Sequence, residues 1–199
     1  MAKRIVAAVL LAAAAGCGGE GGPSEAFTVE VTPAAAGLFS AAPGNTVTLS
    51  VQAKDGGGAV LGGGTRSFTS GSAAVATVDA AGKVTAVGAG TTSITASVTI
   101  GGTTESATAS ITVEVAPTAA TVTAPALLFT PPNVDVQAGG SVTWSIADVH
   151  HAVEFTSAGA PTDLPELQNA SASRTFSTSG TYTYRCPIHP SMTGSVRVH

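Results

Sequence analysis

Short alternating segments separated by turn-forming residues are the feature that most restricts the fold of this chain. Phe27–Thr32 and Thr46–Gln52 alternate with the two-residue period of a half-buried strand. Turn-forming clusters such as Gly56–Gly58 and Gly62–Gly64 separate these segments. Spacings of about eight to twelve residues between turns are typical of β-sandwiches and barrels. No long run with helical spacing follows residue 16. The sequence therefore predicts an all-β fold.

The composition narrows the classes of function. Hydrophobic residues make up 44% of the chain and charged residues only 10%, so the chain is too apolar to be disordered. The formal net charge is −4, and removal of Lys3 and Arg4 with a signal segment would make it more negative. Nucleic-acid binding needs clustered Lys and Arg, so nucleic acid is not an expected partner.

The N-terminus has the form of an export signal. Lys3 and Arg4 precede the apolar run Ile5–Ala15, which is too short to span a bilayer as a helix. The run ends in Ala14-Ala15-Gly16-Cys17, which resembles a bacterial lipobox. The resemblance implies that residues 1–16 are removed, that Cys17 is lipidated and that residues 17–25 form a flexible tether.

Two locations follow from this interpretation. The lipid anchor would hold the protein in the cell envelope, either in the periplasm or at an outer-membrane or cell surface. The alternative is ordinary cleavage near Ala13–Gly16, which would release a soluble protein.

Residues 26–116 are expected to form the first folded unit. Val75–Ala96 contains a strand, a turn through Asp79 and Gly82, a second strand and a glycine corner, and it resembles the bacterial immunoglobulin-like group 2 domain. Phe68 stands where that family usually has Trp. The unit contains no Cys or His, so we interpret it as a spacer, with adhesion as the alternative.

The most informative chemistry lies near the C-terminus. Cys186, His189 and Met192 place a thiol, an imidazole and a thioether within seven residues. Soft and borderline donors of this kind suit copper far better than magnesium or calcium. Zinc is the alternative metal, because Cys and two His can also bind it. A Cys17–Cys186 disulfide is the competing interpretation of the two cysteines, but each has a better local explanation.

A second histidine donor must come from elsewhere in the chain. His151 shares one face of a predicted strand with Val153 and Phe155, which indicates burial, whereas His150 shares the other face with Ala152 and Glu154. The alternation therefore favours His151 as the ligand. His199 ends the printed sequence and is expected to be a frayed terminus.

Residues 117–199 resemble a known family. Trp144–Phe155 and Gly180–Gly194, with their Cys-x2-His-x2-Met loop, are similar to the small blue-copper cupredoxins, and the short loop is similar to that of amicyanin-like members. The resemblance implies a Greek-key β-sandwich and one type 1 copper ion, with the ligands His151, Cys186, His189 and Met192. Ala152 stands where the family often has Asn, so one loop-to-loop hydrogen bond is in doubt.

The expected function is one-electron transfer through Cu(II) and Cu(I) at the cell envelope. The alternative is a surface lipoprotein that holds copper or attaches through its immunoglobulin-like unit. A copper enzyme would need an additional catalytic centre with several more histidines, and the chain has only 4, so an enzyme is not expected. A redox protein of unknown identity and the membrane are the expected partners, and the protein is expected to be a monomer.

Overall fold

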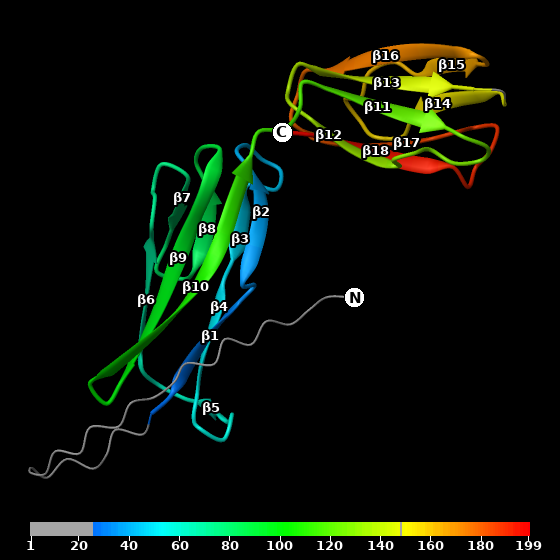
Figure 1. The fold of residues 1–199 in the computed structure, drawn as a ribbon. Helices are drawn as coiled ribbons and strands as arrows, with labels where there is room; N and C mark the ends of the chain where they lie inside the picture. The colour runs from blue at the N-terminus through cyan, green and yellow to red at the C-terminus, as the bar shows by residue number, and fades with distance from the viewer. Residues whose placement is uncertain (1–25, 148) are drawn as a thin grey trace, which may run out of the picture.

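The computed structural model describes residues 26–147 and 149–199, and its strands form two successive β units (Figure 1). The prediction of an all-β fold is confirmed. The predicted signal peptide, the tether and Cys17 lie outside the described residues. Within the residues that are described, no helix is long and apolar enough to cross a membrane.

The first unit contains three sheets, with strand orders β1-β4-β5, β2-β10-β9-β6 and β3-β8-β7. The strands are β1 (Thr28–Thr32), β2 (Ala35–Phe39), β3 (Thr46–Thr48), β4 (Ser50–Lys54), β5 (Val60–Leu61), β6 (Thr65–Ser70), β7 (Ala76–Val78), β8 (Lys83–Ala86), β9 (Gly90–Ile100) and β10 (Thr103–Glu114).

The predicted turn through Asp79 and Gly82 is present between β7 and β8. The Asp79 carboxylate accepts hydrogen bonds from the backbone N–H groups of Ala81 and Lys83, both at 2.9 Å. Gly82 has φ +81°, and a Cβ there would meet Leu49 and the ring of Phe68 at less than 3 Å. Glycine is therefore required both by the backbone conformation and by the packing of Phe68.

The second unit contains two sheets, with strand orders β11-β13-β16 and β12-β18-β17-β14-β15. The strands are β11 (Ala119–Ala124), β12 (Asn133–Val136), β13 (Gly140–Ile146), β14 (His151–Phe155), β15 (Leu164–Leu167), β16 (Ala170–Phe176), β17 (Gly180–Arg185) and β18 (Thr193–Val198).

Aromatic side chains fill the space between the two sheets of the second unit. Val142, Trp144 and Ile146 on β13 are buried, as their alternation predicts. The ring of Trp144 packs edge-on against Tyr184, with centroids 5.3 Å apart, and against Phe155 at 5.7 Å. Cys186 belongs to the same buried cluster, so this core supports the loop that follows β17.

One predicted strand is divided in the structure. Thr46–Gln52 forms two strands in place of one, because the N–H of the buried residue Leu49 bonds the carbonyl of Gly82 in another segment. In the second unit, β11 ends at Ala124, because Pro125 follows and Ala126 has φ +54°.

Two predictions of exposure were wrong. Ala152 is buried, because the pairing of β14 with β15 shifts register between His151 and Val153 and the simple alternation fails there. His199 is not a frayed terminus: only 6% of its surface is exposed, and its backbone N–H bonds the carbonyl of Val136 at 2.9 Å.

Candidate metal centre

The first histidine of the site stands at the start of β14. His151 is 0% exposed, and the bulge between His151 and Val153 turns successive residues into the interior. His150 has the opposite orientation, as predicted: its side chain is exposed and its Nδ1 lies 2.5 Å from Glu166. The preceding loop therefore presents one histidine to solvent and the next to the core.

The other donors lie in the short loop between β17 and β18. Cys186 directly follows β17 and is 0% exposed. The loop closes on itself, because the N–H of Cys186 donates to the carbonyl of Met192 at 3.0 Å and the N–H of Met192 donates to the carbonyl of His189 at 2.9 Å. Pro187 and Pro190 restrict the backbone between these bonds. This closed loop holds the sulfur and the imidazole on the same side.

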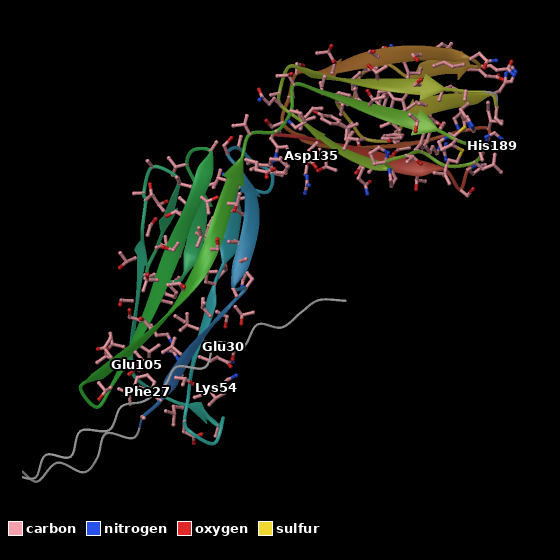
Figure 2. All side chains as sticks on the ribbon, viewed as in Figure 1. Phe27, Glu30, Lys54, Glu105, Asp135 and His189 are labelled. Atoms are coloured by element: carbon pink, nitrogen blue, oxygen red, sulfur yellow. The ribbon has the colours of Figure 1, made fainter. Side chains whose placement is uncertain are left out.

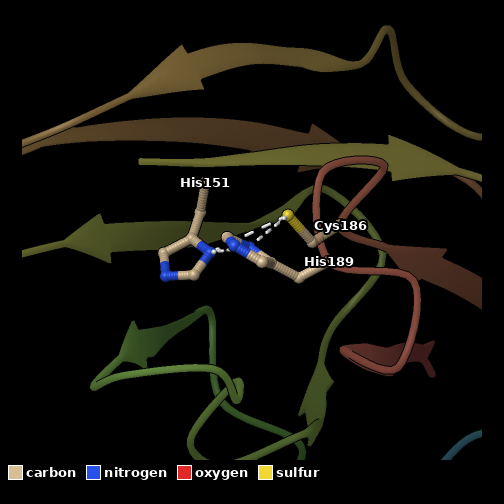
Figure 3. A group of neighbouring side chains, drawn as sticks. All are labelled: His151, Cys186 and His189. Carbon is tan, nitrogen blue, oxygen red and sulfur yellow. Dashed lines mark hydrogen bonds between the residues drawn. The ribbon is translucent and has the colours of Figure 1, made fainter. Parts of the chain in front are cut away.

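Three side-chain atoms from the two segments meet in one place (Figure 3). The Nδ1 atoms of His151 and His189 are 3.2 Å apart, and the Cys186 sulfur lies 3.8 Å from the first and 3.7 Å from the second. These three residues form the metal-site grouping found within the described part of the chain.

The spacing of the three atoms fits a bound metal ion. A circle through a triangle with these sides has a radius of about 2.1 Å, close to the metal–nitrogen and metal–sulfur distances of about 2.0–2.3 Å that are usual in proteins. The two nitrogens and the sulfur could therefore hold one metal ion between them. A trigonal set of two His and one Cys is the arrangement of blue-copper sites.

Burial favours the neutral, metal-binding form of His151. Removal of the ring from water lowers its pKa, the neighbouring His189 lowers it further, and the backbone carbonyl of Ala126 opposes both effects. No hydrogen-bond partner of ordinary geometry faces the buried Nε2 atom of His151 among the described residues. The Nδ1 atom lies 3.8 Å from the cysteine sulfur, so in the tautomer with its proton on Nε2 the Nδ1 lone pair is available to a metal.

Met192 and His199 differ in their relation to this centre. Met192 is 2% exposed and belongs to the same buried cluster as Cys186. Its backbone carbonyl accepts a hydrogen bond from the N–H of Cys186. The role of its sulfur as an axial ligand stays a prediction. His199 bonds Asp135 and lies with it at the opposite end of the unit from His189 (Figure 2). Residue spacing gave no signal for two other neighbours of the site, Glu166 and the Ala126 carbonyl.

Comparison with known proteins assigns this part of the chain. Residues 113–199 match the family model of copper binding proteins of the plastocyanin/azurin family. The second unit is a plastocyanin/azurin-family domain. This family binds copper and transfers electrons, and the donor set of the cupredoxin domain is consistent with type 1 copper. Residues 51–100 match the model of the intimin immunoglobulin-like domain, which confirms the immunoglobulin-like prediction for the first unit.

Solved structures similar to the cupredoxin domain include several amicyanins. A reduced Cu(I) form of an amicyanin variant at pH 4 is 33% identical over 43% of this chain and 87% of that chain, with a TM-score of 0.38. The amicyanin of Paracoccus versutus is 28% identical over 41% of this chain and 81% of that chain, with the same TM-score of 0.38. No curated protein sequence matches this chain.

Proposed function

We propose that this protein carries single electrons at the bacterial cell envelope through one type 1 copper ion bound by His151, Cys186, His189 and Met192. The observation that supports the proposal most directly is the convergence of two imidazole nitrogens and one cysteine sulfur at 3.2–3.8 Å from one another. Copper bound there would alternate between Cu(II) and Cu(I).

The protein's own contribution is to hold the donors still. His151 and Cys186 are fully buried, and two backbone hydrogen bonds close the 186–192 loop. Donors that are fixed by the core and by their own backbone rearrange little when the charge of the ion changes. Met192 would act as the weak axial donor that tunes the potential.

The surface around His189 supplies an exit for the electron. His189 is half-buried, while nearby loops carry a set of exposed apolar side chains that we call the apolar rim. Its members are Leu127, Leu128, Val149 and Ile188, which are between 40% and 57% exposed. These loops follow β11, β13 and β17, at the end of the unit where Figure 2 labels His189. An apolar rim of this kind suits brief contact with a redox protein.

We further propose that the protein is a monomeric carrier and not an enzyme. The match to the plastocyanin/azurin family supports this part of the proposal, because proteins of that family transfer electrons and are generally not enzymes. Lipidation of Cys17 would anchor the chain in the envelope, with the immunoglobulin-like unit as a spacer.

Attachment is the second candidate function. The match of residues 51–100 to the intimin immunoglobulin-like domain favours a role of the first unit at a surface, with the second unit holding copper. Electron self-exchange separates the two candidates, since fast exchange by the copper-loaded protein supports the carrier and slow exchange supports copper holding.

Titration of the metal-free protein with Cu(II) tests the metal centre itself. We expect an intense visible absorption that saturates at one copper per chain, because a thiolate bound to Cu(II) absorbs strongly. The Cys186→Ala variant should bind without that band. A colourless wild-type protein at saturating Cu(II) would contradict the proposal.

A further inference from the structure

The residue that follows β18 packs against a loop of the first unit. The ring of His199 lies 3.9 Å from the ring of Phe39, measured between centroids. Its Nδ1 atom lies 3.4 Å from the carbonyl oxygen of Ala41. Only 6% of the surface of His199 is exposed. An aromatic ring from the second unit is thus enclosed by residues that are about 160 positions away in the sequence.

Charged groups complete this contact from the second unit. One oxygen of Asp135 accepts hydrogen bonds from His199 Nε2 at 2.7 Å and from Arg197 Nε at 2.6 Å. The guanidinium of Arg197 lies 5.7 Å from the centre of the Phe39 ring, within the range of about 6 Å for a cation–π interaction. We call these residues the junction cluster: Phe39, Ala41, Asp135, Arg197 and His199.

The charges in the junction cluster are mutually compensated. Partial burial tends to raise the pKa of Asp135, but the hydrogen bonds from Arg197 and His199 and the positive charge of Arg197 outweigh this effect and lower the pKa. The carboxylate is therefore held ionised between two nitrogen donors. Arg197 and His199 both lie against Phe39 of the first unit. The ion pair and the ring contact therefore form only when the two units are packed together.

Hydrogen bonds within the first unit hold the shape of the loop that contacts His199. The N–H of Phe39 donates to the carbonyl of Gly44 at 3.1 Å, and the N–H of Ser40 donates to the carbonyl of Glu114 at 2.9 Å. Gly44 has φ +90°, and a Cβ there would lie 3.7 Å from both His199 and Phe39. Residues 39–44 therefore offer a preformed surface to the second unit.

The connection between the units is also tied down. β10 ends at Glu114 and β11 begins at Ala119, so four residues join them. Ala116 is 2% exposed, while the carbonyls of Pro117 and Thr118 accept hydrogen bonds from Gln137 at 2.8 Å and Ser141 at 3.0 Å. These bonds fix residues 117 and 118 to the second unit, so the contacts of the junction cluster decide how that unit is oriented on the first.

We propose that the junction cluster locks the two units into one rigid body, with the residue 39–44 loop as the docking surface for the second unit. Figure 2 places Asp135 at the junction and His189 at the opposite end of the second unit. The lock fixes the direction in which that end faces, away from the first unit. The evidence for the lock is the set of contacts described above. Only its use, to hold a redox centre away from the proposed lipid anchor at Cys17, rests on the proposed function.

Nuclear magnetic resonance of the full chain tests the lock without copper. Residual dipolar couplings from both units should fit one alignment tensor in the wild-type protein, and both units should have one rotational correlation time. In His199→Ala and in Phe39→Ala we expect two different tensors, and the correlation time of the second unit should roughly halve, because it would tumble as a body of about half the volume.

The exposed histidine supplies a matched control. His150→Ala removes an imidazole from the same unit but not from the junction cluster, so it should keep the single tensor. Phe39→Ala lies in the first unit and keeps the test valid if His199→Ala disturbs folding of the second. Two tensors in the wild-type protein, or one tensor in both junction variants, would overturn the lock. Copper colour should persist in both junction variants, whereas Cys186→Ala should lose colour and keep one tensor.

Discussion

The Nδ1 atoms of His151 and His189 lie 3.2 Å apart, although 38 residues separate them in the sequence. Two lone-pair-bearing nitrogens at this distance repel unless a proton or a cation lies between them. The protein therefore uses its fold to hold a pair of groups that are stable together only when something positive is shared. A metal ion held by these residues would satisfy both nitrogens and the nearby cysteine sulfur at once.

Replacing each of the two adjacent histidines by alanine shows which of them is a copper ligand. His151→Ala should abolish the intense Cu(II)–thiolate absorption, because one of three converging donors is lost. His150→Ala should keep it, because that side chain faces solvent and its exposed pair with Glu166 is worth only about 0–1 kcal/mol. Equal loss of the band in both variants would contradict the assignment of His151.

Met192→Leu tests the axial ligand. Leucine preserves the buried volume but has no donor atom, and Cu(II) gains more from an extra donor than Cu(I) does. We expect copper to stay bound and the reduction potential to rise, by about 59 mV for each tenfold loss of relative affinity for Cu(II). Cyclic voltammetry measures the shift. An unchanged potential would show that the Met192 sulfur is not a ligand.

Much of the candidate site could be read from the sequence, because its donors are constrained locally. Cys186, His189 and Met192 lie in one short loop, so their spacing alone brings them together. The two-residue period of a strand was enough to choose His151 over His150, even though the same period failed at Ala152. That failure came from a bulge, and a bulge depends on which strand pairs alongside.

The position of His199 could not be predicted in this way. Its burial depends on Asp135 and on Phe39, which belongs to the other unit, and no local pattern records how two units meet. The Ala126 carbonyl near His151 is a similar case, since it results from a single residue with φ +54°. Contacts between distant segments are set by packing and not by residue spacing.

Stability at high pH should depend on Tyr184. Burial raises the pKa of this phenol to about 12, with a smaller opposing effect from Trp144. A group whose pKa is raised in the folded state stabilises the protein below its unfolded pKa of about 10 and loses that contribution as pH rises toward the folded value. We expect the free energy of unfolding to fall by about 2–3 kcal/mol between pH 10 and 12, since each pKa unit is worth 1.36 kcal/mol.

The matched variant for this test is Tyr184→Phe. It loses one hydrogen bond to the carbonyl of Pro132, at 3.0 Å, which should cost about 0.5–1.5 kcal/mol at neutral pH. The carbonyl of Pro132 still accepts a hydrogen bond from the N–H of Ser195, so it keeps a hydrogen-bond partner in the variant. Urea unfolding at several pH values should show a flatter alkaline profile in the variant. Parallel profiles would mean that Tyr184 does not control the alkaline transition.

Gly194 is expected to be the least replaceable glycine of the second unit. A Cβ at this position of β18 would overlap the carbonyl oxygen of Pro132 and the ring of Tyr184, and neither backbone nor a packed ring can move cheaply. Gly194→Ala should therefore destabilise the protein by about 1–3 kcal/mol through overpacking. Gly37→Ala is the control, because Gly37 also lies in a strand but a Cβ there meets nothing within 4 Å. Thermal unfolding compares the two, and equal midpoints would show that β18 and the Pro132 segment separate more easily than this packing implies.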